Sequence, residues 1–223
     1  MIRDELAKYI EHTLLLPQAV DSDYERLCQE ALEHGFYGVC VPPCRVQLAS
    51  SLLSGSDVRV VTVVGFPLGF STTAAKVCEA EDALAEGAQE LDLVINIGFL
   101  KEGRWAAVEQ EISSIVRCAV SGGEKPVTKV IIETCYLSDK EKSTAAQVIH
   151  SAGADFVKTS TGFGPKGASV EDVALLRRAV SGRLQIKAAG GIRTRDQALA
   201  LVKAGADRLG TSCGPDLIKT KNI

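Results

Sequence analysis

The feature that most constrains the fold is a regular alternation of two kinds of segment. Short runs rich in β-branched residues alternate with longer stretches whose apolar residues recur at a helical period. The predicted strands are HTLLL, YGVCVPP, VRVVTVVGFP, ELDLVIN, VTKVIIETC, DFVKTSTG, LQIKAAGG and DRLGTS. Eight such units in 223 residues predict an α/β fold, a closed (β/α)8 TIM barrel, with an open doubly wound sheet as the alternative.

Amphipathic stretches separate the predicted strands. The clearest are DSDYERLCQEALEHG, STTAAKVCEAEDALAEG, EGRWAAVEQEISSIVRCAVSGG and SVEDVALLRRAVSG. In the first of them Asp21 is a plausible N-cap and Gly35 marks the C-terminal turn. A short extra helix is expected over residues 3–10. Because no Pro-rich or Ser-rich linker interrupts the pattern, we expect a single barrel domain over residues 1–223.

Charge and cysteine usage narrow the class of protein. The 25 basic and 28 acidic residues are mixed along the chain, which favours a small-molecule ligand over nucleic acid or a membrane surface. No signal peptide and no run of eighteen apolar residues is present, so we expect a cytoplasmic protein.

The seven cysteines are scattered, which predicts reduced thiols. Cys40 and Cys44 lack a second ligand pair, so no metal site is expected.

A weak repeat relates four of the strands. The segments EHGFYGVC, AEGAQELD, SAGADFVK and KAGADRLG each place a glycine after a helix and then enter a strand. Five residues after these glycines stand Cys40, Asp92, Lys158 and Gly210, on the second, fourth, sixth and eighth strands. Alternate strands of a (β/α)8 barrel supply one layer of inward side chains. The repeat therefore predicts that these four residues share a layer, with Asp92 facing Lys158.

Lysines inside strands are the second unusual feature. Lys187 lies in the seventh strand and can approach Lys158 from a neighbouring level. At about 6 Å and an effective dielectric near 20, two ammonium groups repel by roughly 3 kcal/mol, or about two pKa units. Burial acts in the same direction, so one amine can be partly neutral and attack a carbonyl to form a Schiff base, with Asp92 moving protons. The spacing does not say which lysine is the nucleophile.

A purely structural interpretation competes with this one. For a single lysine, snorkelling at the barrel mouth or a buried ion pair between Asp92 and Lys158 is the better explanation. For Lys158, Lys187 and Asp92 together we favour function. Lys129, in the fifth strand, is assigned a structural role that also shapes the local field. Cys40 is interpreted as a small pocket-lining residue, since the repeat places no histidine beside it.

Glycine-bearing loops after the last strands predict an anion site. The loops after strands seven and eight are the usual phosphate site of this architecture, and Thr194 or Asp196 can cap the next helix so that its N–H groups face the barrel top. Arg193 can add positive charge. The residues expected at this site are Gly162, Gly190, Gly191, Gly210, Thr211 and Ser212.

The motifs VKTSTGF, KAAGGIR, LDLVINIG, KVIIET and VGFPLG, taken together, resemble the 2-deoxyribose-5-phosphate aldolase family over nearly the whole chain. The resemblance implies a class I aldolase that reversibly cleaves 2-deoxy-D-ribose 5-phosphate into D-glyceraldehyde 3-phosphate and acetaldehyde, without a metal or other cofactor, in deoxynucleoside catabolism. It implies the Schiff base at Lys158 and the proton donor and acceptor roles at Asp92 and Lys187. It also implies a phosphate site near Gly162, Gly190, Gly191, Gly210 and Ser212, and a homo-oligomer, expected to be a dimer. We expect Thr13, Cys40 and Lys129 to line the pocket.

Two departures from the family pattern stand out. The family commonly has Asp-His-Thr near the N-terminus, whereas this chain has Glu11, His12 and Thr13, so a carboxylate near the lysines is one methylene longer. Some members carry a C-terminal tail ending in tyrosine, whereas this sequence ends DLIKTKNI, so we expect no proton transfer by such a tail. Two alternative functions are a phosphosugar isomerase or epimerase that uses Asp92 as base without a covalent intermediate, and a non-catalytic phosphosugar-binding protein.

Overall fold

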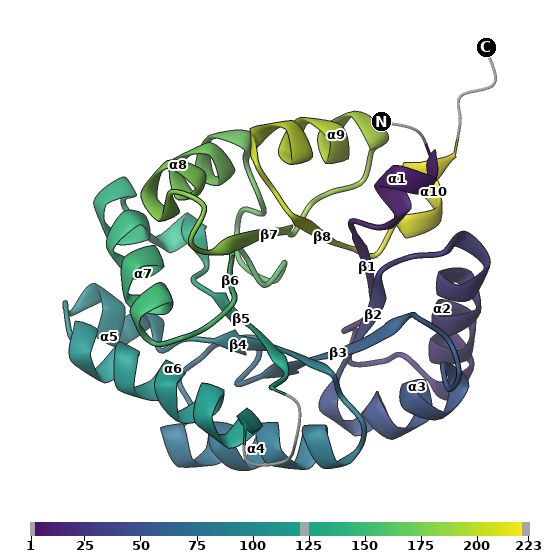
Figure 1. Ribbon diagram of the computed structural model, residues 1–223, viewed down its shortest axis with the longest axis horizontal. Helices are drawn as coiled ribbons and strands as arrows, with labels where there is room; N and C mark the ends of the chain where they lie inside the picture. The colour runs from purple at the N-terminus through teal and green to yellow at the C-terminus, as the bar shows by residue number, and fades with distance from the viewer. Residues whose placement is uncertain (1–2, 121–124, 220–223) are drawn as a thin grey trace.

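The computed structural model describes residues 3–120 and 125–219, and it contains a closed barrel of eight parallel strands in sequence order. The (β/α)8 prediction is confirmed, and Figure 1 shows the barrel viewed along its axis with the helices in a ring around it. The strands are β1 (Ile10–Thr13), β2 (Gly38–Val41), β3 (Arg59–Val64), β4 (Glu90–Val94), β5 (Val127–Ile131), β6 (Phe156–Lys158), β7 (Gln185–Ala189) and β8 (Arg208–Thr211).

The helices cover the outer face of the barrel. The short α1 and α10 lie beside each other at the join between β1 and β8 (Figure 1). The described helices are α1 (Arg3–Ala7), α2 (Asp21–His34), α3 (Val46–Leu52), α4 (Thr73–Ala85), α5 (Ile97–Lys101), α6 (Trp105–Val120), α7 (Asp139–Ser151), α8 (Val170–Val180), α9 (Arg195–Ala204) and α10 (Gly214–Ile218), with short 3₁₀ turns at Pro43–Arg45 and Thr134–Tyr136.

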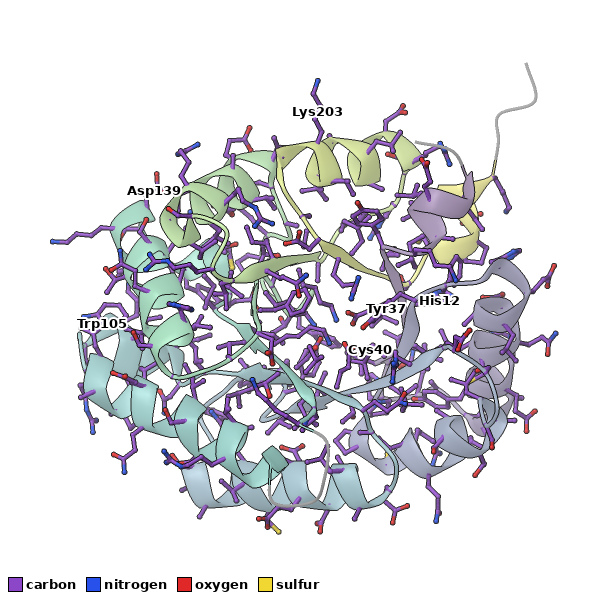
Figure 2. All side chains as sticks on the ribbon, viewed as in Figure 1. His12, Tyr37, Cys40, Trp105, Asp139 and Lys203 are labelled. Carbon is purple, nitrogen blue, oxygen red and sulfur yellow. The ribbon has the colours of Figure 1, made fainter. Side chains whose placement is uncertain are left out.

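Apolar side chains are buried on both faces of the sheet, as expected for a parallel sheet covered by helices. The larger core lies between the strands and the helical ring, and a small one inside the barrel consists of Cys40, Val61 and Val63. In Figure 2, Lys203 and Asp139 extend from the outside of the ring. Few apolar side chains fill the barrel interior, which leaves room there for charged residues.

The first strand lies two residues earlier than predicted. Glu11 pairs in register with Gly38 of β2 and with Gly210 of β8, so β1 closes the barrel over Ile10–Thr13. The apolar residues 14–16 that suggested a later strand lie instead at the barrel mouth, where they line a cavity. Apolar character alone did not distinguish a strand from the loop that follows it.

Helix termini follow the predicted glycine repeat, with one correction. The four repeat glycines, Gly35, Gly87, Gly153 and Gly205, all have positive φ, the backbone conformation that favours glycine at a helix end. Asp21 is the first residue of α2 and not its N-cap. The N-cap position is Val20, whose N–H donates to Asp23 Oδ2 at 3.0 Å.

Two predicted helix ends differ from the described ones. The first helix was predicted over residues 3–10, but α1 stops at Ala7 because Ile10 already belongs to β1. The predicted helix over residues 102–123 begins at Trp105, and its last part, 121–123, lies outside the described residues. Over the described ranges, no helix has the length and apolar character needed to cross a bilayer.

Candidate active site

Asp92 of β4 is at the centre of a group of buried charges inside the barrel. Its Oδ2 accepts hydrogen bonds from the Nζ atoms of Lys158 on β6 and Lys187 on β7, each at 2.6 Å. The exposed fraction is 0% for Asp92 and Lys187 and 3% for Lys158. The predicted juxtaposition of these three side chains is therefore confirmed.

Further charged side chains surround this trio. Lys129 of β5 lies 3.0 Å from Asp92 Oδ1 and 2.6 Å from Glu90 Oε2. Glu11 accepts a hydrogen bond from Lys187 and lies 3.5 Å from Lys129 Nζ. On the far side of the cluster, Tyr37 donates to Glu90 and stacks beneath the Arg208 guanidinium. The cluster contains four cationic residues and three acids: Lys129, Lys158, Lys187, Arg208, Glu11, Glu90 and Asp92.

Neighbouring charges fix the protonation of three members of the cluster. Burial disfavours the carboxylate of Asp92, but the ammonium groups of Lys129, Lys158 and Lys187 outweigh burial and hold its pKa well below the ordinary value. Burial likewise disfavours the ammonium of Lys187, yet Asp92 and Glu11 together raise its pKa. The pKa of Lys129 is raised well above its ordinary value, because Asp92, Glu11 and Glu90 outweigh its burial. These three groups therefore remain charged at neutral pH.

The pKa of Lys158 shifts in the opposite direction to that of the other two lysines. Its pKa is lowered, first by burial and then by the nearby charge of Lys187, while Asp92 compensates only in part. Since the cluster holds one more cationic residue than acids, loss of a proton from Lys158 also balances its charge. The structure thus distinguishes the two lysines that the sequence spacing left equivalent.

A cavity of about 350 Å³ opens at the carboxyl ends of the strands. Lys158 is the only member of the charged cluster that lines this cavity. Thr13 also lines it, as predicted. Cys40 and Lys129, which were expected to line the pocket, are fully buried and are not among its lining residues. Burial raises the pKa of Cys40 to about 11, so this thiol is protonated at neutral pH. The cavity-lining residues come from the ends of β1, β6, β7 and β8 and from the loops that follow these strands.

The predicted phosphate-binding residues all line this cavity, as do Arg193 and Thr211. The predicted residues are Gly162, Gly190, Gly191, Gly210 and Ser212. In the described part of the chain, the amides of Gly162, Gly190, Gly191 and Ser212 donate to no protein acceptor. Such unpaired N–H groups are suited to an anion. Thr194 is the N-cap of α9 and accepts from Gln197 N at 3.3 Å, so of the two predicted caps Thr194 is the right one.

Gly210 has a different role from the other glycines. A Cβ atom at this position would lie 3.0 Å from Ala189 Cβ and 3.2 Å from Lys187 Cε. The missing side chain therefore leaves space for the stem of Lys187 inside the barrel. The repeat predicted that Gly210 shares a layer with Asp92 and Lys158, and this close approach agrees with it.

Several residues of the site were missed by the sequence reasoning. Tyr37, Glu90 and Arg208 extend the charge cluster, and Glu133 binds the loop that follows Lys158. Glu90 stands two residues before Asp92 in a strand, so it points to the same face, and this alternation is a signal that was available. The others depend on contacts between distant segments. The C-terminal tail at 220–223 lies outside the described residues.

Comparison with known proteins agrees with this geometry. The model of the DeoC/LacD family of aldolases matches residues 6–220. A deoxyribose-phosphate aldolase from Thermococcus gammatolerans is 53% identical over 221 residues, which cover 98% of this chain and 97% of that protein. One from Thermoanaerobacter sp. (strain X514) is 52% identical, with 97% of each chain covered.

A solved structure extends the comparison to three dimensions. The tetrameric deoxyribose phosphate aldolase from Aeropyrum pernix superposes with a TM-score of 0.90 at 37% identity, covering 97% of this chain and 90% of that one. Sequence and fold thus agree over almost the full length of the chain and of its relatives. The protein is an enzyme, and it belongs to the DeoC/LacD family of aldolases.

Proposed function

We propose that the protein reversibly cleaves 2-deoxy-D-ribose 5-phosphate into D-glyceraldehyde 3-phosphate and acetaldehyde through a Schiff base on Lys158. The observation that carries the proposal is that Lys158 alone connects the buried charge cluster with the cavity. Its amine lies 2.6 Å from Asp92 and its pKa is lowered by burial and by Lys187. A neutral amine at the floor of a cavity can attack an aldehyde that enters from above.

The first step is attack of the neutral Lys158 amine on the aldehyde carbon of the open-chain sugar. The carbonyl oxygen takes up a proton, and the resulting carbinolamine loses water to give an iminium ion. We assign Lys187 to donate these protons, because it still carries its proton at neutral pH and shares an Asp92 oxygen with Lys158. Asp92 accepts from both lysines through one oxygen, so a proton can pass between them.

The second step breaks the carbon–carbon bond. The iminium withdraws the bonding electrons as the sugar's C3 hydroxyl loses its proton, which releases the three-carbon aldehyde phosphate and leaves an enamine on Lys158. Protonation of the enamine carbon and addition of water then release acetaldehyde and restore the amine. Asp92 is the group we assign to these proton transfers, since its low pKa keeps it a carboxylate between the lysines.

The phosphate group of the substrate fits the glycine-lined part of the cavity. We assign it to the unpaired amides of Gly162, Gly190, Gly191 and Ser212, with Arg193 at the rim. Backbone N–H groups and a cation favour an anion at this position. Anchoring the phosphate there holds the aldehyde end of the substrate over Lys158.

We further infer a cytoplasmic enzyme that assembles as a homodimer. Exposed apolar side chains, including Phe70 at 73% and Leu68 at 58%, support contacts between copies of the chain. Light scattering combined with size-exclusion chromatography tests the assembly. A mass equal to one chain or to four chains would contradict the dimer.

The proposed reaction is tested by a coupled assay for released aldehyde. Wild-type protein should cleave 2-deoxy-D-ribose 5-phosphate, and Lys158→Met should lower kcat by at least about 1,000-fold, because an apolar side chain of similar length cannot form the iminium. Lys101→Met is the matched control, since Lys101 is a surface lysine paired with Glu141 outside the barrel. Its activity should equal that of the wild type.

Other outcomes would contradict the proposal. Substrate turnover that survives Lys158→Met would indicate an isomerase or epimerase with Asp92 as base. Tight binding of the sugar phosphate by the wild type without release of aldehyde would indicate a binding protein.

A further inference from the structure

Glu133 is a buried carboxylate that the reaction does not use. It lies two residues after the end of β5, is only 2% exposed, and belongs to the motif KVIIET. Its backbone has φ 50° and ψ 69°, a left-handed conformation that residues other than glycine rarely adopt. A backbone strained in this way persists only where surrounding contacts hold it, and such residues cluster at functional sites.

The carboxylate of Glu133 binds the loop that follows the reactive lysine. Its Oε2 accepts from the Thr161 N–H at 3.2 Å and also from the Thr161 hydroxyl. The same hydroxyl oxygen accepts from the Phe163 N–H at 3.0 Å. These bonds enclose Gly162, which lines the main cavity and whose own amide donates to no protein acceptor in the described part of the chain.

The loop lies directly against this carboxylate. A Cβ atom at Gly164 would stand 3.0 Å from Glu133 Cδ, so a side chain at this position would have to displace the carboxylate. The ends of β5 and β6 are also joined, because Thr134 N donates to Thr159 O at 2.9 Å. Glu133 is thus fixed relative to the barrel, and the loop is fixed relative to Glu133.

Glu133 does not line the main cavity and lies on the other side of the loop, at a smaller cavity of about 170 Å³. Both Thr161 donors bind the same oxygen, Oε2. The carboxylate therefore acts on the anion site through the geometry of the loop, while the loop separates its negative charge from the bound phosphate.

We propose that Glu133 is a positioning residue for the substrate phosphate, acting through Thr161 to hold the Gly162 amide toward the anion site. This inference depends on the proposed function in one respect, namely that the bound anion is the phosphate of the sugar. It predicts that loss of the carboxylate weakens recognition of phosphate and leaves the chemistry at Lys158 unchanged.

The test compares a phosphorylated with an unphosphorylated substrate. Glu133→Ala should raise KM for 2-deoxy-D-ribose 5-phosphate by about tenfold or more, with less than about a twofold change in kcat or in kcat/KM for 2-deoxy-D-ribose. Glu133→Gln keeps an acceptor oxygen for Thr161 and should stay within about threefold of wild type. Thr161→Val should reproduce the effect of Glu133→Ala, and the double variant should add little to it.

A matched control comes from another loop at the barrel mouth. Glu79 accepts from Gly65 N at 2.6 Å, so it also fixes a loop backbone, but that loop does not line the cavity. Glu79→Ala should leave the preference for the phosphorylated substrate unchanged. Equal losses on both substrates in Glu133→Ala, or no loss on either, would overturn the proposal.

Calorimetry with inorganic phosphate separates this proposal from the reaction itself. Glu133→Ala should bind phosphate at least about tenfold more weakly than wild type. If the wild type binds phosphate but cleaves no sugar phosphate, the proposed function fails and the phosphate affinity still decides the role of Glu133. Unchanged phosphate affinity in Glu133→Ala would refute the positioning role.

Discussion

The charge of Lys187 has a calculable effect on Lys158. Both amines lie 2.6 Å from the same oxygen of Asp92, so their nitrogens are no more than 5.2 Å apart. At that separation and an effective dielectric of about 20, their repulsion is about 3 kcal/mol, or about two pKa units. Replacing Lys187 by methionine removes this repulsion, and the pKa of Lys158 should therefore rise by about two units.

The assay is the pH dependence of covalent trapping by acetaldehyde and cyanoborohydride. Only the neutral amine of Lys158 reacts, so the rate increases as pH rises through its pKa and then levels off. In Lys187→Met the midpoint of this rise should move to higher pH by about two units. The control Lys101→Met removes a lysine outside the barrel and should leave the midpoint unchanged.

The direction of the shift is the decisive result. A midpoint that stays at its wild-type value would show that Lys187 does not depress the pKa of Lys158, and burial alone would then account for it. A midpoint that moves to lower pH would refute the electrostatic reasoning.

Two other substitutions test the surroundings of the site. Asp92→Asn removes the carboxylate that raises the pKa of Lys158, so the trapping midpoint should fall below that of wild type. The cleavage kcat should also fall at least about 100-fold for want of a proton carrier, and an unchanged kcat would exclude Asp92 from that role. Glu111→Leu removes the carboxylate that lies 3.0 Å from the buried ammonium of Lys76. Urea unfolding should show a loss of about 3–5 kcal/mol in the free energy of unfolding, because the ammonium is left without its ion-pair partner. Adding Lys76→Met should recover most of that loss, whereas no recovery would show that the pair is not coupled.

The barrel was predictable from sequence because its signals are local and repeated. Each βα unit carries its own β-branched run and helix, and the equal offset from the glycine that precedes four of the strands placed Asp92 and Lys158 in one layer. The first strand was predicted two residues too late, because residues 14–16 are as apolar as the residues of a strand. What places β1 is the pairing of Glu11 with Gly38 and Gly210, which no local pattern reveals.

The charge balance of the site was only partly predictable. Mutual repulsion between Lys158 and Lys187 follows from their strands, but the spacing treats the two amines alike. They differ because Glu11, 176 residues away in sequence, binds Lys187. The longer carboxylate at position 11 thus pairs with the lysine that keeps its charge. Such long-range pairings depend on how the barrel closes.

The loop contacts were not predictable at all. The motif KVIIET was visible, but nothing in it indicates that Glu133 adopts a left-handed backbone or binds Thr161 across 28 residues of sequence. Pocket-lining assignments failed for Cys40 and Lys129 for a related reason. Both side chains point inward as expected, but at a depth below the cavity that only the stagger of the strands determines.

The most direct test of the account is peptide mass spectrometry of the enzyme after reduction with borohydride in the presence of acetaldehyde. The account predicts one added ethyl group on the peptide containing Lys158, and none on the peptides containing Lys129 or Lys187. Modification of Lys187 with Lys158 unlabelled, or no stable adduct at all, would contradict the claim that a partly neutral amine on β6 is the nucleophile.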